Sequence, residues 1–198
     1  MYEIAIIGID GAGKTTVGAL LSDRLKAKGH RVELAHFKAR DAALFGDIDR
    51  HGIEIPQEVR MIGYSLDLMA QHRHAEIASE DVVVWDRHIC CLYAYFRALG
   101  LSTDWLDQVG TLIPQPDLTV WLRIEPLDAV ERLDNSGRVR KPLENEDFLS
   151  VVHKQYSELR SRFSMIEINA ARPLEKVVDE IEACCRIDGG NVHDSIYL

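Results

Sequence analysis

The sequence lacks a long hydrophobic run, an excess of basic residues and any recognisable export signal. No stretch approaches the ~18 consecutive apolar residues of a membrane helix. Met1 leads directly into the short apolar run Ile4 to Ile9, without a basic segment before it. Lysine and arginine number 23 against 32 aspartate and glutamate residues, so the formal net charge is −9. A general nucleic-acid binder needs a basic face, and we therefore expect neither a nucleic-acid polymer nor a membrane as partner.

The cysteines are few and have the wrong spacing for metal or redox sites. They form two adjacent pairs, Cys90-Cys91 and Cys184-Cys185, and neither pair has the spacing of a zinc knuckle or a CxxC motif. A reduced protein is the simplest interpretation, and we expect it in the cytoplasm. We also expect small buried side chains at the first pair and at least one buried thiol in the second.

Length and composition favour one folded domain. With 198 residues, 46% of them hydrophobic, the chain can bury a sizeable core. We therefore expect a single domain over residues 1–198, without internal repeats. The polar, basic segment 134–143 is expected to be a flexible loop, and the tail of about residues 188–198 to be loosely held.

Short apolar runs alternate with helical patterns along the chain. The expected strands are Glu3–Gly8, Arg31–His36, Val82–Trp85, Leu118–Leu122 and Met165–Ile168. Helices are expected from residue 13 or 14 to about 29, and over about 56–78, 89–99, 126–133, 144–163 and 174–185. This alternation predicts the α/β class, with a five-stranded parallel sheet between two layers of helices.

A glycine-rich segment carries the strongest functional signal. Residues 8–15, GIDGAGKT, match the pattern GxxxxGK[ST] between an expected strand and an expected helix. Glycines allow backbone N–H groups to point at phosphate oxygens, and the helix N-terminus favours the same anions. In this pattern Lys14 reaches the β- and γ-phosphates and Thr15 ligates Mg²⁺. A chance match has a probability of only ~3 in 100,000 per position, so we predict a nucleotide phosphate site.

A second strand supports this prediction. The apolar run Val82–Trp85 is followed directly by Asp86. A carboxylate at the carboxyl end of such a strand is where the Mg²⁺-associated acid of P-loop enzymes lies. We therefore expect Thr15 and Asp86 to hold the metal.

The sequence as a whole resembles the thymidylate kinase family of nucleoside monophosphate kinases, from about residue 3 to 183. The segment GIDGAGKTT (8–16) is similar to the family's phosphate loop, and WDRH (85–88) to its DR-aromatic motif. PDLTVWLRIEPLDAVERL (116–133) resembles the family's PDLT strand with the Pro-led helix after it. Residues 162–163 and 166–170 resemble the segment near adenine. The resemblance implies a P-loop kinase fold, ATP and Mg²⁺ as cofactors, dTMP as acceptor, and a homodimer.

The resemblance also assigns roles residue by residue. For catalysis it implies Lys14, Asp86, Arg87, Arg138 and Arg140. For the ATP phosphates and adenine it implies Gly8, Gly11, Ala12, Gly13, Lys14, Thr15, Thr16, Arg132 and Asn169. For the acceptor it implies Asp10, Phe37, Arg40, Tyr64, Arg87 and Tyr95, with Arg87 on the phosphate and Tyr95 beside the ribose.

The phosphate loop has alanine where some family members carry arginine. Ala12 therefore indicates the subgroup whose cationic groups lie in a lid, and Arg138 and Arg140 are the candidates. An arginine that closes late stabilises the charge that phosphoryl transfer spreads over the moving group. The alternative for these two residues is a solvated basic loop.

The acceptor side departs from the family pattern. Leu68 replaces the base-reading arginine, and Cys91, Leu92 and Phe96 stand where polar residues are common. The REPG block after the second strand is absent, and residues 36–41 read HFKARD. Two alternatives therefore stay open: a kinase for another small acceptor, such as a modified pyrimidine nucleotide or a nucleoside-like natural product, and a regulatory nucleotide-binding protein.

The remaining aromatic residues are expected to have structural roles. His88 is expected to fill the aromatic position of the DR motif by packing, and His72 and His74 to lie on the surface of the long helix. Trp85, Trp105 and Trp121 are expected to pack in the core or between helices.

Overall fold

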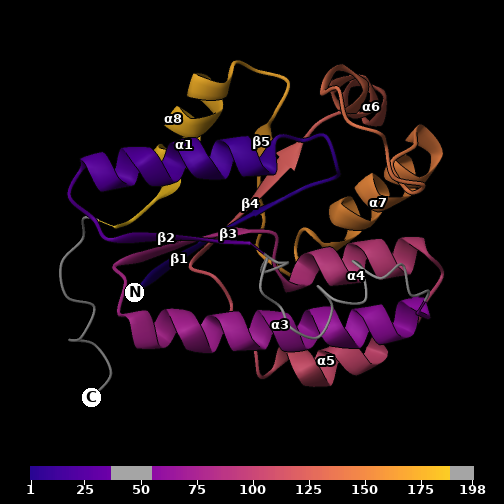
Figure 1. Cartoon of the computed structure of the whole chain (residues 1–198), viewed down its shortest axis with the longest axis horizontal. Helices are drawn as coiled ribbons and strands as arrows, with labels where there is room; N and C mark the ends of the chain where they lie inside the picture. The colour runs from indigo at the N-terminus through magenta and orange to yellow at the C-terminus, as the bar shows by residue number, and fades with distance from the viewer. Residues whose placement is uncertain (37–54, 188–198) are drawn as a thin grey trace.

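The computed structural model describes residues 1–36 and 55–187, and its centre is a five-stranded parallel sheet (Figure 1). The strands are β1 (Tyr2–Ile7), β2 (Val32–His36), β3 (Val82–Asp86), β4 (Leu118–Arg123) and β5 (Ile166–Asn169). Their order across the sheet is β2-β3-β1-β4-β5. The predicted α/β class and the five-stranded parallel sheet are confirmed, and each strand lies within one residue of its predicted bounds.

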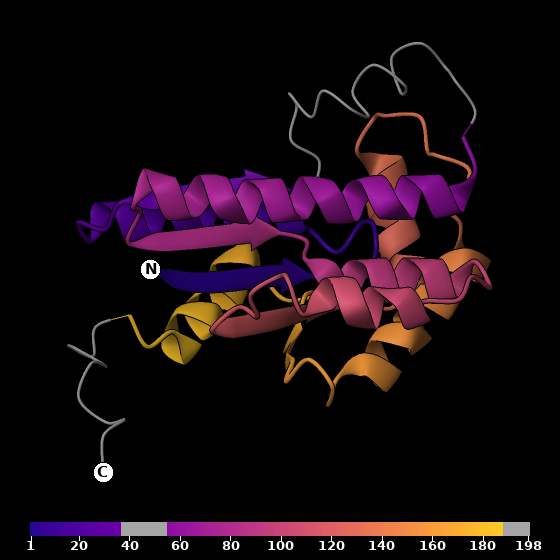
Figure 2. The ribbon, with the colours of Figure 1, turned by 90° about the horizontal axis from the view of Figure 1, so that it is seen from below.

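Seven helices of the described residues pack around this sheet. They are α1 (Lys14–Ala27), α3 (Gln57–Ala78), α4 (Ile89–Ala98), α5 (Asp104–Gly110), α6 (Pro126–Asn135), α7 (Glu146–Leu159) and α8 (Leu174–Cys184). Helices α1 and α8 cover one face of the sheet, whereas α3, α4 and α5 lie on the other (Figures 1 and 2). None of these helices combines the length and apolar character that crossing a lipid bilayer requires.

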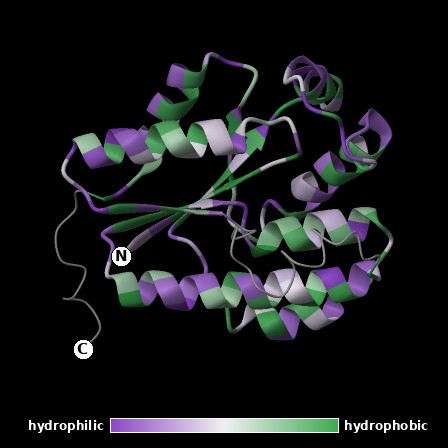
Figure 3. Cartoon of the chain, in the orientation of Figure 1, coloured by the Kyte–Doolittle hydropathy of each residue, from purple (hydrophilic) through white to green (hydrophobic). Residues whose placement is uncertain are grey.

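The core follows the continuous apolar runs of the central strands. Val82–Trp85 of β3 and Ile4–Ile7 of β1 are completely buried, as expected of parallel strands with helices on both faces. Figure 3 shows the same pattern, with hydrophobic residues on the strands and on the helix sides that face them. Trp85 and Trp121 are core residues, and Trp105 packs against the core.

Three details differ from the sequence predictions. Helix α5 was not predicted, because seven residues span less than two full helical turns and show no clear period. His72 was predicted on the surface but is buried, because it lies on the side of α3 that faces the sheet. Cys184 and Cys185 are both half-buried, whereas at least one was expected to be buried; Cys90 and Cys91 are buried as predicted.

Sheet order places the glycine-rich loop against helix α6. The loop follows β1, which lies between β3 and β4, and α6 begins shortly after β4. Gly11 has a left-handed φ of 85°, and an added Cβ would overlap the backbone carbonyl of Ala129 in α6. Glycine at this position therefore allows both the turn and the close contact.

We expect Gly11→Ala to destabilise the fold more than Gly29→Ala. Gly29 has a similar φ of 94°, but an added Cβ there would meet no atom within 4 Å. The backbone strain alone should cost about 1 kcal/mol at Gly29, whereas overlap with Ala129 should raise the cost at Gly11 to at least about 2 kcal/mol. Urea unfolding of the two variants measures this difference, and equal losses would contradict the close packing of the loop on α6.

Candidate active site

The loop after β1 and the start of α1 form one wall of a cleft of about 570 Å³. Lys14 is buried at the first position of α1, and its Nζ donates to the carbonyl of Ile9 at 2.7 Å. The first N–H groups of a helix have no intrahelical acceptor and carry the positive end of its dipole. This donor cleft, as we name it, therefore offers an anion a buried ammonium group and the backbone donors of a helix start.

The expected metal pair meets at the floor of the cleft. The Thr15 hydroxyl donates to Asp86 Oδ2 at 2.6 Å, and His36 Nδ1 lies 3.3 Å from the same oxygen. β2 and β3 pair in parallel with His36 opposite Asp86, which explains how the two side chains come together. A hydroxyl and a carboxylate are hard oxygen ligands of the kind that Mg²⁺ prefers, so Thr15 and Asp86 fit the predicted metal.

A second cleft, of about 510 Å³, opens on the other side of Asp86. We name it the acceptor cleft, and its lining comprises Asp10, Thr15, His36, Gln57, Tyr64, Asp86, Arg87, Cys91, Leu92, Tyr95, Phe96, Leu99, Lys141 and Leu143. Four of these residues also line the donor cleft: Asp10, Thr15, Asp86 and Arg87. The two clefts therefore meet at a junction that carries two carboxylates and a guanidinium group.

An ion pair between Asp10 and Arg87 dominates this junction. Arg87 Nη2 donates to Asp10 Oδ1, and the Tyr95 hydroxyl donates to Asp10 Oδ2 at 2.9 Å. Burial alone would raise the pKa of Asp10, but the positive charges of Arg87 and Lys14 outweigh it and hold that pKa well below its ordinary value. Asp10 is therefore a carboxylate at every physiological pH.

The lid segment (residues 134–143) places one arginine at the donor cleft. Arg138 lines this cleft and donates to both carboxylate oxygens of the buried Glu144, at 2.8 and 2.9 Å. Arg140 instead pairs with Asp134, its Nε 2.7 Å from Oδ1, and donates to the carbonyl of Glu144. Within the described chain, Arg140 lines neither cleft.

Most predicted site residues come together around the two clefts. The donor cleft is lined by Gly11, Ala12, Gly13, Lys14, Thr15, Thr16 and Arg132. Of the described residues predicted for nucleotide binding, Gly8 and Asn169 line neither cleft; the Asn169 side chain accepts from the backbone N–H of Ala171. Tyr64 and Tyr95 line the acceptor cleft, whereas Phe37 and Arg40 fall outside the described residues.

The residues that differ from the family pattern do not all lie at the acceptor cleft. Cys91, Leu92 and Phe96 face the acceptor cleft, but Leu68 is completely buried in the core. Sequence reasoning missed His36, Gln57, Lys141, Leu143 and Glu144. His36 could have been found from the sequence, because it ends a parallel strand beside the one that ends at Asp86. The other four come near the site only because of how α3 and the chain around the lid segment pack.

Comparisons with known proteins find relatives over nearly the whole chain. The family described as Thymidylate kinase matches residues 6–181. A probable thymidylate kinase of Archaeoglobus fulgidus is 32% identical over 189 residues, covering 90% of this chain and 91% of its own. A probable thymidylate kinase of Sulfolobus acidocaldarius is 26% identical, covering 91% and 94%.

A solved structure has the same fold. It is a deoxyadenosine kinase from M. mycoides with the products dCMP and a flexible dCDP bound, and it superposes with a TM-score of 0.71. The match covers 92% of this chain and 97% of that chain at 18% sequence identity, a level that supports the fold alone. Family match, relatives and fold lead to one conclusion: the chain belongs to the thymidylate kinase family of nucleoside monophosphate kinases.

Proposed function

We propose that this kinase transfers the γ-phosphoryl group of ATP to dTMP or a related deoxynucleoside monophosphate, with Mg²⁺. The observation that carries the proposal is the junction of the two clefts at Asp10, Thr15, Asp86 and Arg87. Transfer between two phosphates needs both groups in line and close together, with cations around the moving group. Two clefts that share one charged junction provide this geometry.

On the donor side, Lys14 and the amides of the loop hold the ATP phosphates. The N-terminus of α1 adds its positive end to the same site. Thr15 and Asp86 would hold Mg²⁺, and the bound ion would neutralise part of the phosphate charge. Arg132 packs at the adenine end, where its Nη2 donates to the carbonyl of Ala170. For Gly8 and Asn169 we propose indirect roles in shaping the loop and the adenine end.

On the acceptor side, Arg87 holds the phosphate that is to be phosphorylated. Its pairing with Asp10 keeps the guanidinium group at the junction before the acceptor arrives. Tyr95 lies next to Asp10 and over Arg87, where its ring limits the space beside the sugar. Tyr64 lines the same cleft as the candidate for stacking on the base, and Phe37 and Arg40 complete the proposed acceptor set.

The lid segment supplies the remaining positive charge. Arg138 lines the donor cleft and pairs with Glu144. It can leave Glu144 and bind the transferred phosphoryl group instead. Arg140 must leave Asp134 to contribute. An arginine that arrives with lid closure stabilises charge that develops only in the transition state. We propose that residues 1–198 act as one domain with this lid.

A specific observation favours a second acceptor class. The lining of the acceptor cleft includes four apolar side chains, Leu92, Phe96, Leu99 and Leu143. Apolar side chains offer a base no hydrogen bond and accept added apolar substituents. The second candidate is therefore a kinase for a modified pyrimidine nucleotide or a nucleoside-like compound. A regulatory nucleotide-binding role has less support, because it needs no acceptor cleft.

We expect Lys14→Ala and Arg87→Ala each to lower kcat/KM by at least ~30-fold, which corresponds to about 2 kcal/mol. Each cation is proposed to face the negative charge that develops on the phosphoryl group, and alanine supplies no positive charge in its place. Lys154→Ala is the matched control, because this lysine lies exposed on α7 and pairs with Glu158 of the same helix. Steady-state ADP release measures the effect, and near-wild-type turnover in both site variants would refute the proposed mechanism.

A panel of acceptors should distinguish the candidates. We expect ADP release that depends on dTMP or another deoxynucleoside monophosphate. Faster turnover of a pyrimidine nucleotide with an apolar substituent than of dTMP would favour the second candidate. Slow ATP hydrolysis that no acceptor accelerates, and that Arg87→Ala leaves unchanged, would favour a regulatory protein.

The affinity for MgATP should fall above pH 8. Burial lowers the pKa of Lys14 to about 8, with Arg87 adding to this effect and Asp10 opposing it. Because the phosphates bind the protonated form, the Kd should rise by up to about tenfold per pH unit above 8. Calorimetry between pH 7 and 9.5 measures this, and Lys14→Arg should stay flat because arginine keeps its proton.

Stability should change in the opposite direction over the same range. The ordinary pKa of lysine, 10.5, applies to the unfolded chain, so between pH 8 and 10.5 the unfolded state binds more protons than the folded one. The contribution of Lys14 to the free energy of unfolding therefore rises with pH in this window. If the MgATP affinity of Lys14→Arg still fell above pH 8, Lys14 would not be the group whose deprotonation weakens binding.

We also propose that the chain forms a homodimer through α3. This helix exposes large hydrophobic side chains at helical spacing: Val59, Ile62, Leu66 and Ile77. We expect Leu66→Asp to shift the protein from dimer to monomer in light scattering, because a buried carboxylate would face the partner helix. Leu112→Asp, at an exposed hydrophobic position outside α3, is the control. A wild-type monomer at micromolar concentration would refute the proposal.

A further inference from the structure

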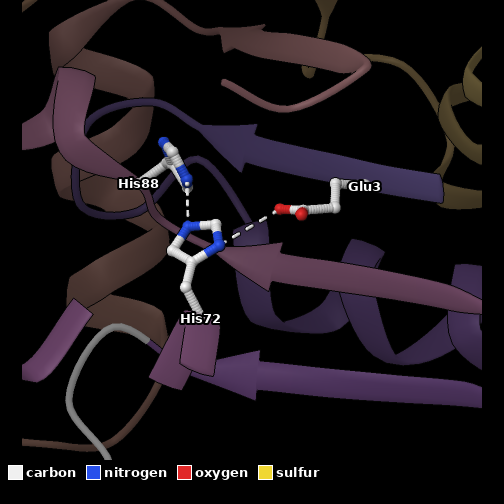
Figure 4. Close-up of side chains that lie close together, drawn as sticks. All are labelled: Glu3, His72 and His88. Atoms are coloured by element: carbon white, nitrogen blue, oxygen red, sulfur yellow. Dashed lines mark hydrogen bonds and ion pairs between the residues drawn. The ribbon is translucent and has the colours of Figure 1, made fainter. Parts of the chain in front are cut away.

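Three ionisable side chains meet in the core, away from both clefts. Glu3 comes from β1, His72 from α3, and His88 from the turn after β3 (Figure 4). Their exposed fractions are 7%, 3% and 1%. Within the described residues, none of the three lines the donor or acceptor cleft. Burying polar groups is unfavourable unless they pair with one another, so the contacts within this cluster must compensate for their burial.

The three side chains form a linear chain of contacts. His72 Nε2 lies 2.9 Å from His88 Nε2, and the opposite ring nitrogen of His72, Nδ1, lies 3.4 Å from Glu3 Oε2 (Figure 4). Trp85 Nε1 donates to the same Glu3 oxygen at 2.9 Å. One nitrogen or oxygen atom from each of the three side chains lies within 4.8 Å of the others. The 2.9 Å between the two Nε2 atoms is, however, a hydrogen-bond distance, shorter than the ~3.3 Å between two nitrogens on one tetrahedral zinc ion. The cluster therefore has the geometry of a polar relay with a hydrogen bond between its two histidines.

Burial determines the charges in this relay. It lowers the pKa of His72 to about 4 and that of His88 to about 3, with the neighbouring His72 adding to the shift of His88. Both imidazoles are therefore neutral, and each has one N–H donor and one acceptor nitrogen. If the N–H of His72 faces Glu3, its Nε2 accepts from His88. At 3.4 Å from Glu3 Oε2, His72 Nδ1 makes no hydrogen bond, so that end of the relay is a close polar contact only.

The relay ends beside the acceptor-phosphate arginine. Arg87 directly precedes His88 and has a φ of 78°, a left-handed conformation that is strained for a non-glycine residue. Such a conformation persists only where the surroundings hold it. On one side the Arg87 N–H donates to the carbonyl of Ile6 at 3.0 Å.

On the other side, the strained backbone is held through His88. Its ring contacts His72, and its carbonyl accepts from Cys91 N–H at the start of α4, at 2.9 Å. The His72 ring also packs on Trp85, with centroids 4.2 Å apart, and Trp85 is in the strand that leads into the turn. His72 therefore connects α3 to both ends of the Asp86-Arg87 turn.

We propose that His72 and His88, oriented by Glu3, are positioning residues that hold the backbone of Arg87 in the conformation required to bind the acceptor phosphate. The proposal rests on the proposed role of Arg87 toward the acceptor. Removing the relay leaves the guanidinium group present but allows its backbone to relax. The loss should appear mainly on the acceptor side, because Lys14 and the loop amides lie outside the turn, and Asp86 stays held by Thr15 and by the pairing of β3 with β1.

The test combines His72→Leu with Arg87→Ala in a double-mutant cycle. His72→Leu keeps an apolar body of similar size and removes both polar contacts. We expect it to raise the KM for dTMP at least tenfold and to leave the KM for ATP within twofold. His72→Gln, whose amide can still pair with His88, should recover most of the loss. His74→Leu, an exposed histidine on the same helix, is the control.

In the Arg87→Ala background, His72→Leu should cause no further loss of dTMP affinity, measured by calorimetry, because both changes act on one group. An equal loss in both backgrounds would overturn the proposal, as would an unchanged KM for dTMP in His72→Leu. If His72→Leu does not fold, Glu3→Gln is measured in the same two backgrounds with the same criteria.

Failure of the relay can be told apart from failure of the acceptor role of Arg87. If Arg87→Ala binds dTMP like the wild type, the proposed acceptor role of Arg87 fails; if it loses binding while His72→Leu does not, only the relay fails. Elemental analysis tests whether the three side chains bind a metal instead. About one equivalent of zinc or another transition metal in the purified protein, lost in His72→Leu, would overturn the hydrogen-bonded relay.

Discussion

The parallel pairing of β1 with β3 is the constraint on which the rest of the site depends. It places Ile6 opposite Asp86, so the glycine-rich loop and the Asp86-Arg87 turn leave the sheet side by side. The carbonyl of Ile6 then accepts from the N–H of Arg87, and Thr15 at the start of α1 reaches Asp86. Donor and acceptor clefts meet because these two adjacent strands end at the same edge of the sheet.

The charges of the site depend on burial as much as on residue type. A chain with a net charge of −9 places two cations, Lys14 and Arg87, in a buried junction with Asp10. The carboxylate stays ionised because the cations compensate for its burial. The site therefore offers positive charge to a small anionic group although the chain as a whole is acidic.

Much of the fold could be predicted because its signals are local. Continuous apolar runs mark the strands, and a 3.6-residue period marks the long helices; both depend on neighbouring residues alone. Helix α5 was missed because a seven-residue helix shows too little of that period. His72 was wrongly predicted on the surface for a different reason. Helix α3 carries polar residues on several sides, and only the packing of His72 against Trp85 and His88 turns its imidazole toward the core.

The amino-acid order alone was enough to identify the phosphate loop, the Asp86-Arg87 motif, the family and the alternation of strands and helices. The two motifs are short local segments, and the family and the alternation follow from the order of such segments along the chain. Which distant residues share a site followed only from the folded arrangement. It places Gln57 and Leu143 at the acceptor cleft, pairs Arg138 with Glu144, leaves Arg140 with Asp134, and joins Glu3 to His72 and His88. These contacts depend on how α3 and the lid segment pack against the sheet, and that packing arises from long-range burial that no local pattern encodes.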